Sequence, residues 1–171
     1  MGFFDKLFGG GKPAKPSAVA AAAEKGAVCA PVSGTVEVTS NVSDPMFAQE
    51  MMGKTVAIWP SDGNVFAPIT GSITAAMPHA LGIAGDDGVE VLIHVGIDTV
   101  TMKGDGFTVW VQGGAHVEAG EPLLTFDRAK VAKAGFQDIV MTIVTNSDDY
   151  PELEKVAEGS VAAGAKVMQT A

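Results

Sequence analysis

Residues 79–100 read HALGIAGDDGVEVLIHVGIDTV and contain two of the chain's three histidines. A Gly-Asp-Asp-Gly stretch at residues 85–88 separates two apolar runs, and the second run alternates with a period of two. Glycine and aspartate favour tight turns, and strict alternation is typical of a half-buried strand. The stretch therefore predicts an antiparallel β-hairpin.

The turn also predicts which residues face each other. If the hairpin is symmetric about Asp86 and Asp87, residues whose numbers sum to 173 are paired, and His79 lies opposite His94. Directly opposed residues have Cβ atoms about 4.5–5.5 Å apart. The hairpin thus predicts a close imidazole pair, although a register slip of one residue would turn one ring to the other face.

The second run predicts two faces for its strand. We expect a buried aliphatic face and an outer face that carries His94, with Gly96 beside it leaving room for a close approach. The buried face is Val91, Ile93, Val95 and Ile97, and the outer face is Glu90, Leu92, His94 and Gly96.

The rest of the chain favours an all-β fold with one or two short helices. Glycine and proline separate short β-branched runs at residues 34–40, 55–60, 71–77, 89–97, 107–111, 122–126 and 138–145. Asp127 is a candidate N-cap and Gly135 a stop for a helix over 127–136, and residues 44–53 suggest another.

Two pairs of similar phrases indicate an internal duplication. APVSGTV at 30–36 resembles APITGSI at 67–73, and HVEAGEPLL at 116–124 resembles SVAAGAKVM at 160–168. Such repeats predict two intertwined sets of hairpins that close an antiparallel β-sandwich or barrel.

Composition divides the chain into three parts. Residues 26–171 form one domain, and 47% hydrophobic residues supply its core. Residues 9–25, rich in Gly, Ala and Pro, form a flexible tether. Residues 1–8 place their apolar side chains on one helical face, which predicts weak contact with a membrane surface; these are Phe3, Phe4, Leu7 and Phe8.

Charge and cysteine content exclude other classes. A net charge of −9 argues against nucleic acid as a partner and suits docking to a basic protein. A single cysteine, Cys29, indicates a reducing compartment, and no apolar run is long enough to span a bilayer. The start lacks a secretory signal, so we expect a cytoplasmic protein.

Two close imidazoles suit more than one chemistry. A neutral imidazole can attack phosphorus while its neighbour contacts the phosphoryl oxygens. Alternatively, the pair could bind zinc with Glu90 or Asp98 as a third ligand, although no recognised metal signature is present. Lys103 in TMKGDG also suggests the lysine turn of a biotinyl or lipoyl carrier.

The chain resembles the glucose-type IIA components of the bacterial sugar phosphotransferase system. The likeness covers nearly the whole chain apart from the tether, and it is carried by APITGSI, residues 79–100, KGDGF, GAHVEAGEPLLTFD and MGFFDKLF. It implies a duplicated hybrid β-sandwich and a phosphotransferase component that needs no cofactor. His94 would be the phosphorylated residue and His79 its phosphoryl-stabilising partner; Met77 stands where the family commonly has Thr.

The resemblance also implies partners. The histidine phosphocarrier protein would be the donor and a cysteine of a IIB domain the acceptor, with regulated permeases or kinases as further partners. Some relatives bind zinc between this histidine pair and a partner's carboxylate. Candidate docking residues are the apolar Phe47, Met51, Met52 and Leu92 and the acidic Asp44 and Asp98.

Two rival functions remain open on the sequence. A zinc hydrolase of the lysostaphin type also uses duplicated hairpins, but it relies on a His-x-His pair that this chain lacks. A non-catalytic interaction module would bind its partners with either histidine replaced.

Overall fold

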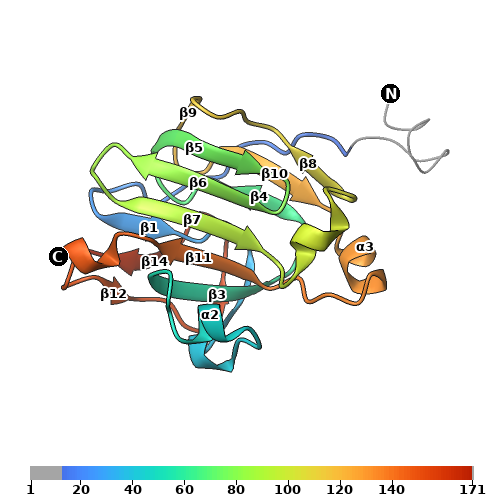
Figure 1. The fold of residues 1–171 in the computed structure, drawn as a ribbon. Helices are drawn as coiled ribbons and strands as arrows, with labels where there is room; N and C mark the ends of the chain where they lie inside the picture. Colours follow the sequence, from blue (N-terminus) through green and yellow to red (C-terminus); the bar gives the residue numbers. More distant parts are fainter. Residues whose placement is uncertain (1–12, 171) are drawn as a thin grey trace.

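The computed structural model describes residues 13–170, which form three antiparallel sheets (Figure 1). The all-β prediction is confirmed. The largest sheet has the order β13 (Ser160–Val161), β2 (Gly34–Glu37), β3 (Lys54–Pro60), β11 (Val140–Val144), β7 (Glu90–Val95), β6 (Ala80–Gly85), β5 (Gly71–Met77) and β9 (His116–Val117). The smaller sheets are β1 (Ala27–Cys29), β14 (Lys166–Gln169) and β12 (Glu154–Lys155), and β4 (Asn64–Phe66), β10 (Pro122–Phe126) and β8 (Phe107–Val109).

The main core lies between the large sheet and the two smaller ones. Val91, Ile93 and Val95 of β7 point into it, as their alternation predicts. Ile97 does not, because Gly96 takes φ +79° and ends the strand, so Ile97 joins a second cluster. That cluster lies on the other face of the large sheet and contains Val42, Phe47, Ala57, Ile97, Ile139, Met141 and Ile143.

Short helices cover parts of the sandwich. The two predicted helices are present as α2 (Pro45–Ala48) and α3 (Arg128–Lys133). Their N-caps are Asp44 and Asp127, whose carboxylates accept hydrogen bonds from backbone N–H groups of the first turn. The remaining helical turns are η1 (Thr39–Asn41), η2 (Thr99–Met102) and η3 (Ser147–Asp149).

The repeated phrases occupy equivalent places in the sheet. Gly34 begins β2 and Gly71 begins β5, and each lies against the backbone of its paired strand. A Cβ at Gly34 would lie 1.9 Å from the Trp59 carbonyl oxygen, and one at Gly71 would lie 2.1 Å from that of Ala84. The shared glycine therefore permits the same close pairing in both halves.

The tether prediction needs correction in its second half. Residues 13–25 are described, and within them Val19 and Ala22 donate backbone hydrogen bonds to the carbonyls of Gly120 and Gly164. This stretch is attached to the body because two glycines allow its backbone to approach. The predicted amphipathic segment at 1–8 lies outside the described residues. Among residues 13–170, no helix is long and apolar enough to cross a membrane.

One buried hydroxyl gives a stability prediction. Thr142 is fully buried in β11, and within the described chain its Oγ1 has no hydrogen-bond partner. An unsatisfied buried hydroxyl is costly, so Thr142→Val should raise the free energy of unfolding by about 1 kcal/mol. Thr55→Val is the matched control and should lower it, because the Thr55 hydroxyl donates to the Gly53 carbonyl at 2.9 Å. Urea denaturation measures both, and a less stable Thr142→Val protein would contradict the prediction.

Candidate functional site

The hairpin between β6 and β7 forms in a register one residue away from the prediction. Ala80, not His79, is the direct partner of His94. The turn is asymmetric because Gly88 adopts a left-handed φ of +98° and the Asp87 carboxylate accepts a hydrogen bond from the N–H of Val89. A three-residue loop with glycine in that conformation shifts the pairing.

His79 nevertheless lies beside His94. It lies in the two-residue turn that joins β5 to β6, between the paired residues Met77 and Ala80. The direction of its side chain is therefore not set by the alternation of either strand. The N–H of Val95 donates to the His79 carbonyl at 2.8 Å, which ties this turn to the end of β7. The two ring centroids are 5.2 Å apart with planes at 78°, so the predicted imidazole pair is present.

The ring of His94 is held on two sides. Its Nδ1 lies 2.9 Å from the carbonyl oxygen of Gly96, which can only accept a hydrogen bond. The Nδ1 atom therefore carries the proton, and Nε2 keeps its lone pair. Phe47 packs against the ring with its centroid 4.9 Å away. The geometry thus presents a single nucleophilic nitrogen in a fixed orientation.

The backbone after His94 explains why glycine stands at position 96. A Cβ there would lie 2.4 Å from Cγ2 of Thr99 and 2.8 Å from the carbonyl oxygen of Gln137. Thr99 is itself buried and donates its hydroxyl to the Val95 carbonyl. The room predicted for a ligand beside Gly96 is therefore filled by the protein, and this glycine instead aims its carbonyl at His94.

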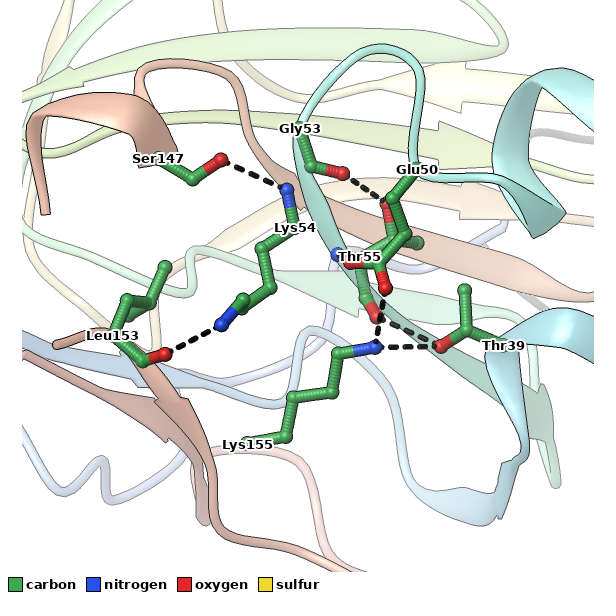
Figure 2. A network of polar contacts seen from close by, with 8 residues as sticks. All are labelled: Thr39, Glu50, Gly53, Lys54, Thr55, Ser147, Leu153 and Lys155. Carbon is green, nitrogen blue, oxygen red and sulfur yellow. Dashed lines mark hydrogen bonds and ion pairs between the residues drawn. The ribbon is translucent and has the colours of Figure 1, made fainter. Parts of the chain in front are cut away.

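The segment that carries Phe47 is anchored by a polar network (Figure 2). The Glu50 carboxylate accepts from the Thr55 N–H at 2.8 Å and from Lys155 Nζ at 3.1 Å. Lys155 also donates to the Thr39 hydroxyl at 3.0 Å. These bonds fix both ends of the stretch from η1 to β3, and α2 between them holds Phe47 over His94.

Electrostatics keep both rings neutral. Burial lowers the pKa of His94, and nearby His79 lowers it further, against the opposing effects of the Gly96 hydrogen bond and of Asp44 and Asp98. Burial also lowers the pKa of His79. Near pH 7 the uncharged form of both imidazoles, with one ring nitrogen free of a proton, is therefore favoured, which a nucleophilic nitrogen requires.

This environment predicts the pH response of the site. NMR titration should place the midpoint of His94 below 6.5, whereas His116, whose pKa the Asp86 carboxylate raises, should titrate above it. Because only the uncharged ring offers a lone pair, the fraction of His94 able to act as a nucleophile should decline only as pH falls through this lowered midpoint. A His94 midpoint at or above that of His116 would contradict this prediction.

The candidate docking residues divide by exposure. Phe47 is only 4% exposed, because its ring is buried in the second cluster against His94. Met52 and Leu92 are half-buried in the same cluster, while Met51 is 71% exposed. Asp44 and Asp98 lie within electrostatic range of His94.

Three exposed apolar side chains near the site were not among the candidate docking residues. Met46 precedes Phe47 in α2, Met77 ends β5 immediately before the Pro78–His79 turn, and Val100 lies in η2, just after Asp98. They are 47%, 46% and 56% exposed. The sequence contained little indication that these three side chains are exposed, because their exposure depends on how α2 and η2 pack along the sheet.

The structure also tests the two alternative chemistries. Within residues 13–170, no three His, Cys, Asp or Glu side chains gather as a metal site, so Glu90 and Asp98 do not complete one with the histidine pair. Two imidazoles alone cannot fill a tetrahedral zinc site. Lys103 is the C-cap of η2, not the tip of a hairpin between strands, which removes the geometric basis for a carrier lysine.

Comparison with known proteins gives concordant matches. Residues 26–150 match the family model described as phosphoenolpyruvate-dependent sugar phosphotransferase system, EIIA 1. The PTS system glucose-specific EIIA component of Halalkalibacterium halodurans is 42% identical over 163 residues, which cover 94% of this chain and 93% of that protein. The Bacillus subtilis PTS system beta-glucoside-specific EIIBCA component is 43% identical over 122 residues, or 70% of this chain and 20% of that protein.

A solved structure shares the fold. The glucose permease IIA from Mycoplasma capricolum superposes with a TM-score of 0.76 at 36% identity, covering 83% of this chain and 93% of that one. The likeness extends through most of the β-sandwich described above.

Proposed function

Because the chain belongs to the EIIA 1 family of the phosphoenolpyruvate-dependent sugar phosphotransferase system, it is a phosphoryl-carrying component of that system, and we propose that Nε2 of His94 carries the group. The observation that supports this assignment is the hydrogen bond from Nδ1 of His94 to the Gly96 carbonyl oxygen. It occupies one ring nitrogen and leaves the other as the nucleophile.

Acceptance is an in-line displacement at phosphorus. The Nε2 lone pair forms the new N–P bond while the N–P bond to the donor's histidine breaks. Phosphorylation at Nε2 makes the His94 ring positive with its Nδ1 proton in place, and the Gly96 carbonyl stabilises that proton. The donor is the histidine phosphocarrier protein, and the acidic Asp44 and Asp98 meet basic residues on it.

Release reverses the roles. A cysteine thiolate on a IIB domain attacks phosphorus, the S–P bond forms, and the N–P bond to His94 breaks with its electron pair returning to Nε2. Two relatives are named EIIBCA components, and this chain matches only part of each. A sequence like this one therefore occurs in one polypeptide with a part named IIB, which supports a IIB partner. The ring of His79 donates a hydrogen bond to a phosphoryl oxygen during both transfers.

The setting follows from this role. We place the protein in the cytoplasm, with exposed Met46, Met77 and Val100 as the apolar docking surface around the histidines. The transfer needs no cofactor. Zinc would bind the pair only with ligands from a partner, and regulated permeases or kinases are further candidates for this surface.

A phosphorylation assay tests the proposal. The protein incubated with the phosphorylated histidine phosphocarrier should gain one acid-labile phosphoryl group, and NMR should assign it to Nε2 of His94. Attachment at Nδ1, or to another residue, would overturn the assignment. As a control, His116→Gln should gain the group normally, since His116 is exposed and bound to Asp86.

A further inference from the structure

Residues 19–22 cross two turns that occupy the same position in the internal repeat. Val19 N–H donates to the Gly120 carbonyl and Ala22 N–H to the Gly164 carbonyl, both at 2.9 Å. Gly120 is the fifth residue of HVEAGEPLL and Gly164 the fifth of SVAAGAKVM. The duplicated phrase therefore presents two similar acceptors to one extended stretch of chain.

Both turns are shaped for close backbone approach. Gly120 and Gly164 have φ of +92° and +91°. A Cβ on Gly120 would lie 2.2 Å from the Val19 carbonyl oxygen, and one on Gly164 would lie 2.1 Å from that of Ala20. Ala21 lies between them, with its Cβ 3.4 Å from the Cβ position of Gly120 and its Cα 3.3 Å from that of Gly164. The close approach of the two backbones suits small side chains, and residues 18–23 read AVAAAA.

The remaining contacts of this segment are few. Glu24 forms an ion pair with Lys166, and the Lys25 carbonyl accepts from Gln169. The Ala22 carbonyl accepts from Sγ of Cys29, which is fully buried beneath it. Most side chains from 18 to 25 are exposed, so little apolar surface holds the segment down. Such segments open locally at a small fraction of the cost of global unfolding.

We propose that the turns at Gly120 and Gly164 form one binding surface for an extended peptide with small side chains, and that residues 18–25, the strap, are its detachable occupant. The docked strap shortens the tether that precedes the domain. Release frees eight residues, which adds up to about 26 Å of reach at roughly 3.3 Å per residue. The surface thus sets how far residues at the N-terminal end can extend, independently of the histidine chemistry.

The single cysteine allows a direct test, because Cys29 is the only thiol in the chain and lies under the strap. Gly120→Ala/Gly164→Ala should raise the rate of maleimide labelling of Cys29 at least tenfold. The matched control is Gly114→Ala/Gly135→Ala: both positions have φ of +88° and nothing within 4 Å of a Cβ, so the strain is equal without a clash. Control labelling should stay close to the wild-type rate.

Two further measurements separate strap release from general destabilisation. Trypsin cleavage after Lys25, followed by mass spectrometry, should accelerate in the Gly120→Ala/Gly164→Ala protein only. Its labelling should also depend weakly on urea, as local opening does. Equal labelling and cleavage in the two double variants would overturn the proposal. So would labelling with the steep urea dependence of global unfolding.

Discussion

His94→Ala is expected to remove phosphoryl acceptance altogether, lowering its rate by more than about a thousandfold. The variant loses the Nε2 lone pair that the site keeps free, since the Gly96 carbonyl holds the proton on Nδ1 and Phe47 packs against the ring. His79 does not replace it, because within the described residues neither of its ring nitrogens has a hydrogen-bond partner to set the tautomer. Mass spectrometry after incubation with the phosphorylated carrier measures the result.

Two controls make this outcome specific. His116→Ala removes an exposed imidazole bound to Asp86 and should be phosphorylated at the wild-type rate. Urea denaturation should show that His94→Ala remains folded, because His94 is a half-buried residue on the outer face of β7, away from the main core. A folded His94→Ala protein that still gains a phosphoryl group would remove His94 from the role proposed for it.

The sequence predicted the parts of this site that depend on local pattern. Alternation placed His94 on the outer face because Val91, Ile93 and Val95 must be buried together. The hairpin pairing was wrong by one residue, since Gly-Asp-Asp-Gly fits both a two-residue and a three-residue turn. The imidazoles still meet because His79 sits in a turn, where that error has no effect on its direction.

The remaining features depend on contacts distant in sequence. The burial of Phe47 was not predicted, because it depends on packing against β11 and on the residues that anchor α2. Gly96 looked like space for a ligand because Gln137 and Thr99 fill it only in the folded chain. No local pattern specifies such packing, so the sequence identified the reactive residues and not what orients them.

Orientation also decides what the second histidine contributes. His79→Gln is expected to accept the group within about threefold of the wild-type rate but to pass it to a IIB domain roughly 10–100-fold more slowly. The imidazole edge faces His94 at 5.2 Å between centroids, a distance at which a ring N–H can reach an oxygen on phosphorylated Nε2. Rapid-quench kinetics with the phosphorylated protein and a IIB domain would measure the step.

The asymmetry between the two steps follows from the direction of each transfer. In acceptance, the phosphoryl group arrives already bound by groups of the donor protein. Those groups partly compensate for the loss of the His79 hydrogen bond. In release, the Gly96 carbonyl and His79 are the polar groups of this chain that we place at the phosphorylated ring. In His79→Gln, charge on the phosphoryl oxygens loses the imidazole N–H, and the glutamine amide, on a flexible side chain, does not hold a donor in the same place. Met77→Leu, a neighbouring apolar change that keeps the ring, should transfer normally; slow transfer by it, or normal transfer by His79→Gln, would assign the effect to docking instead.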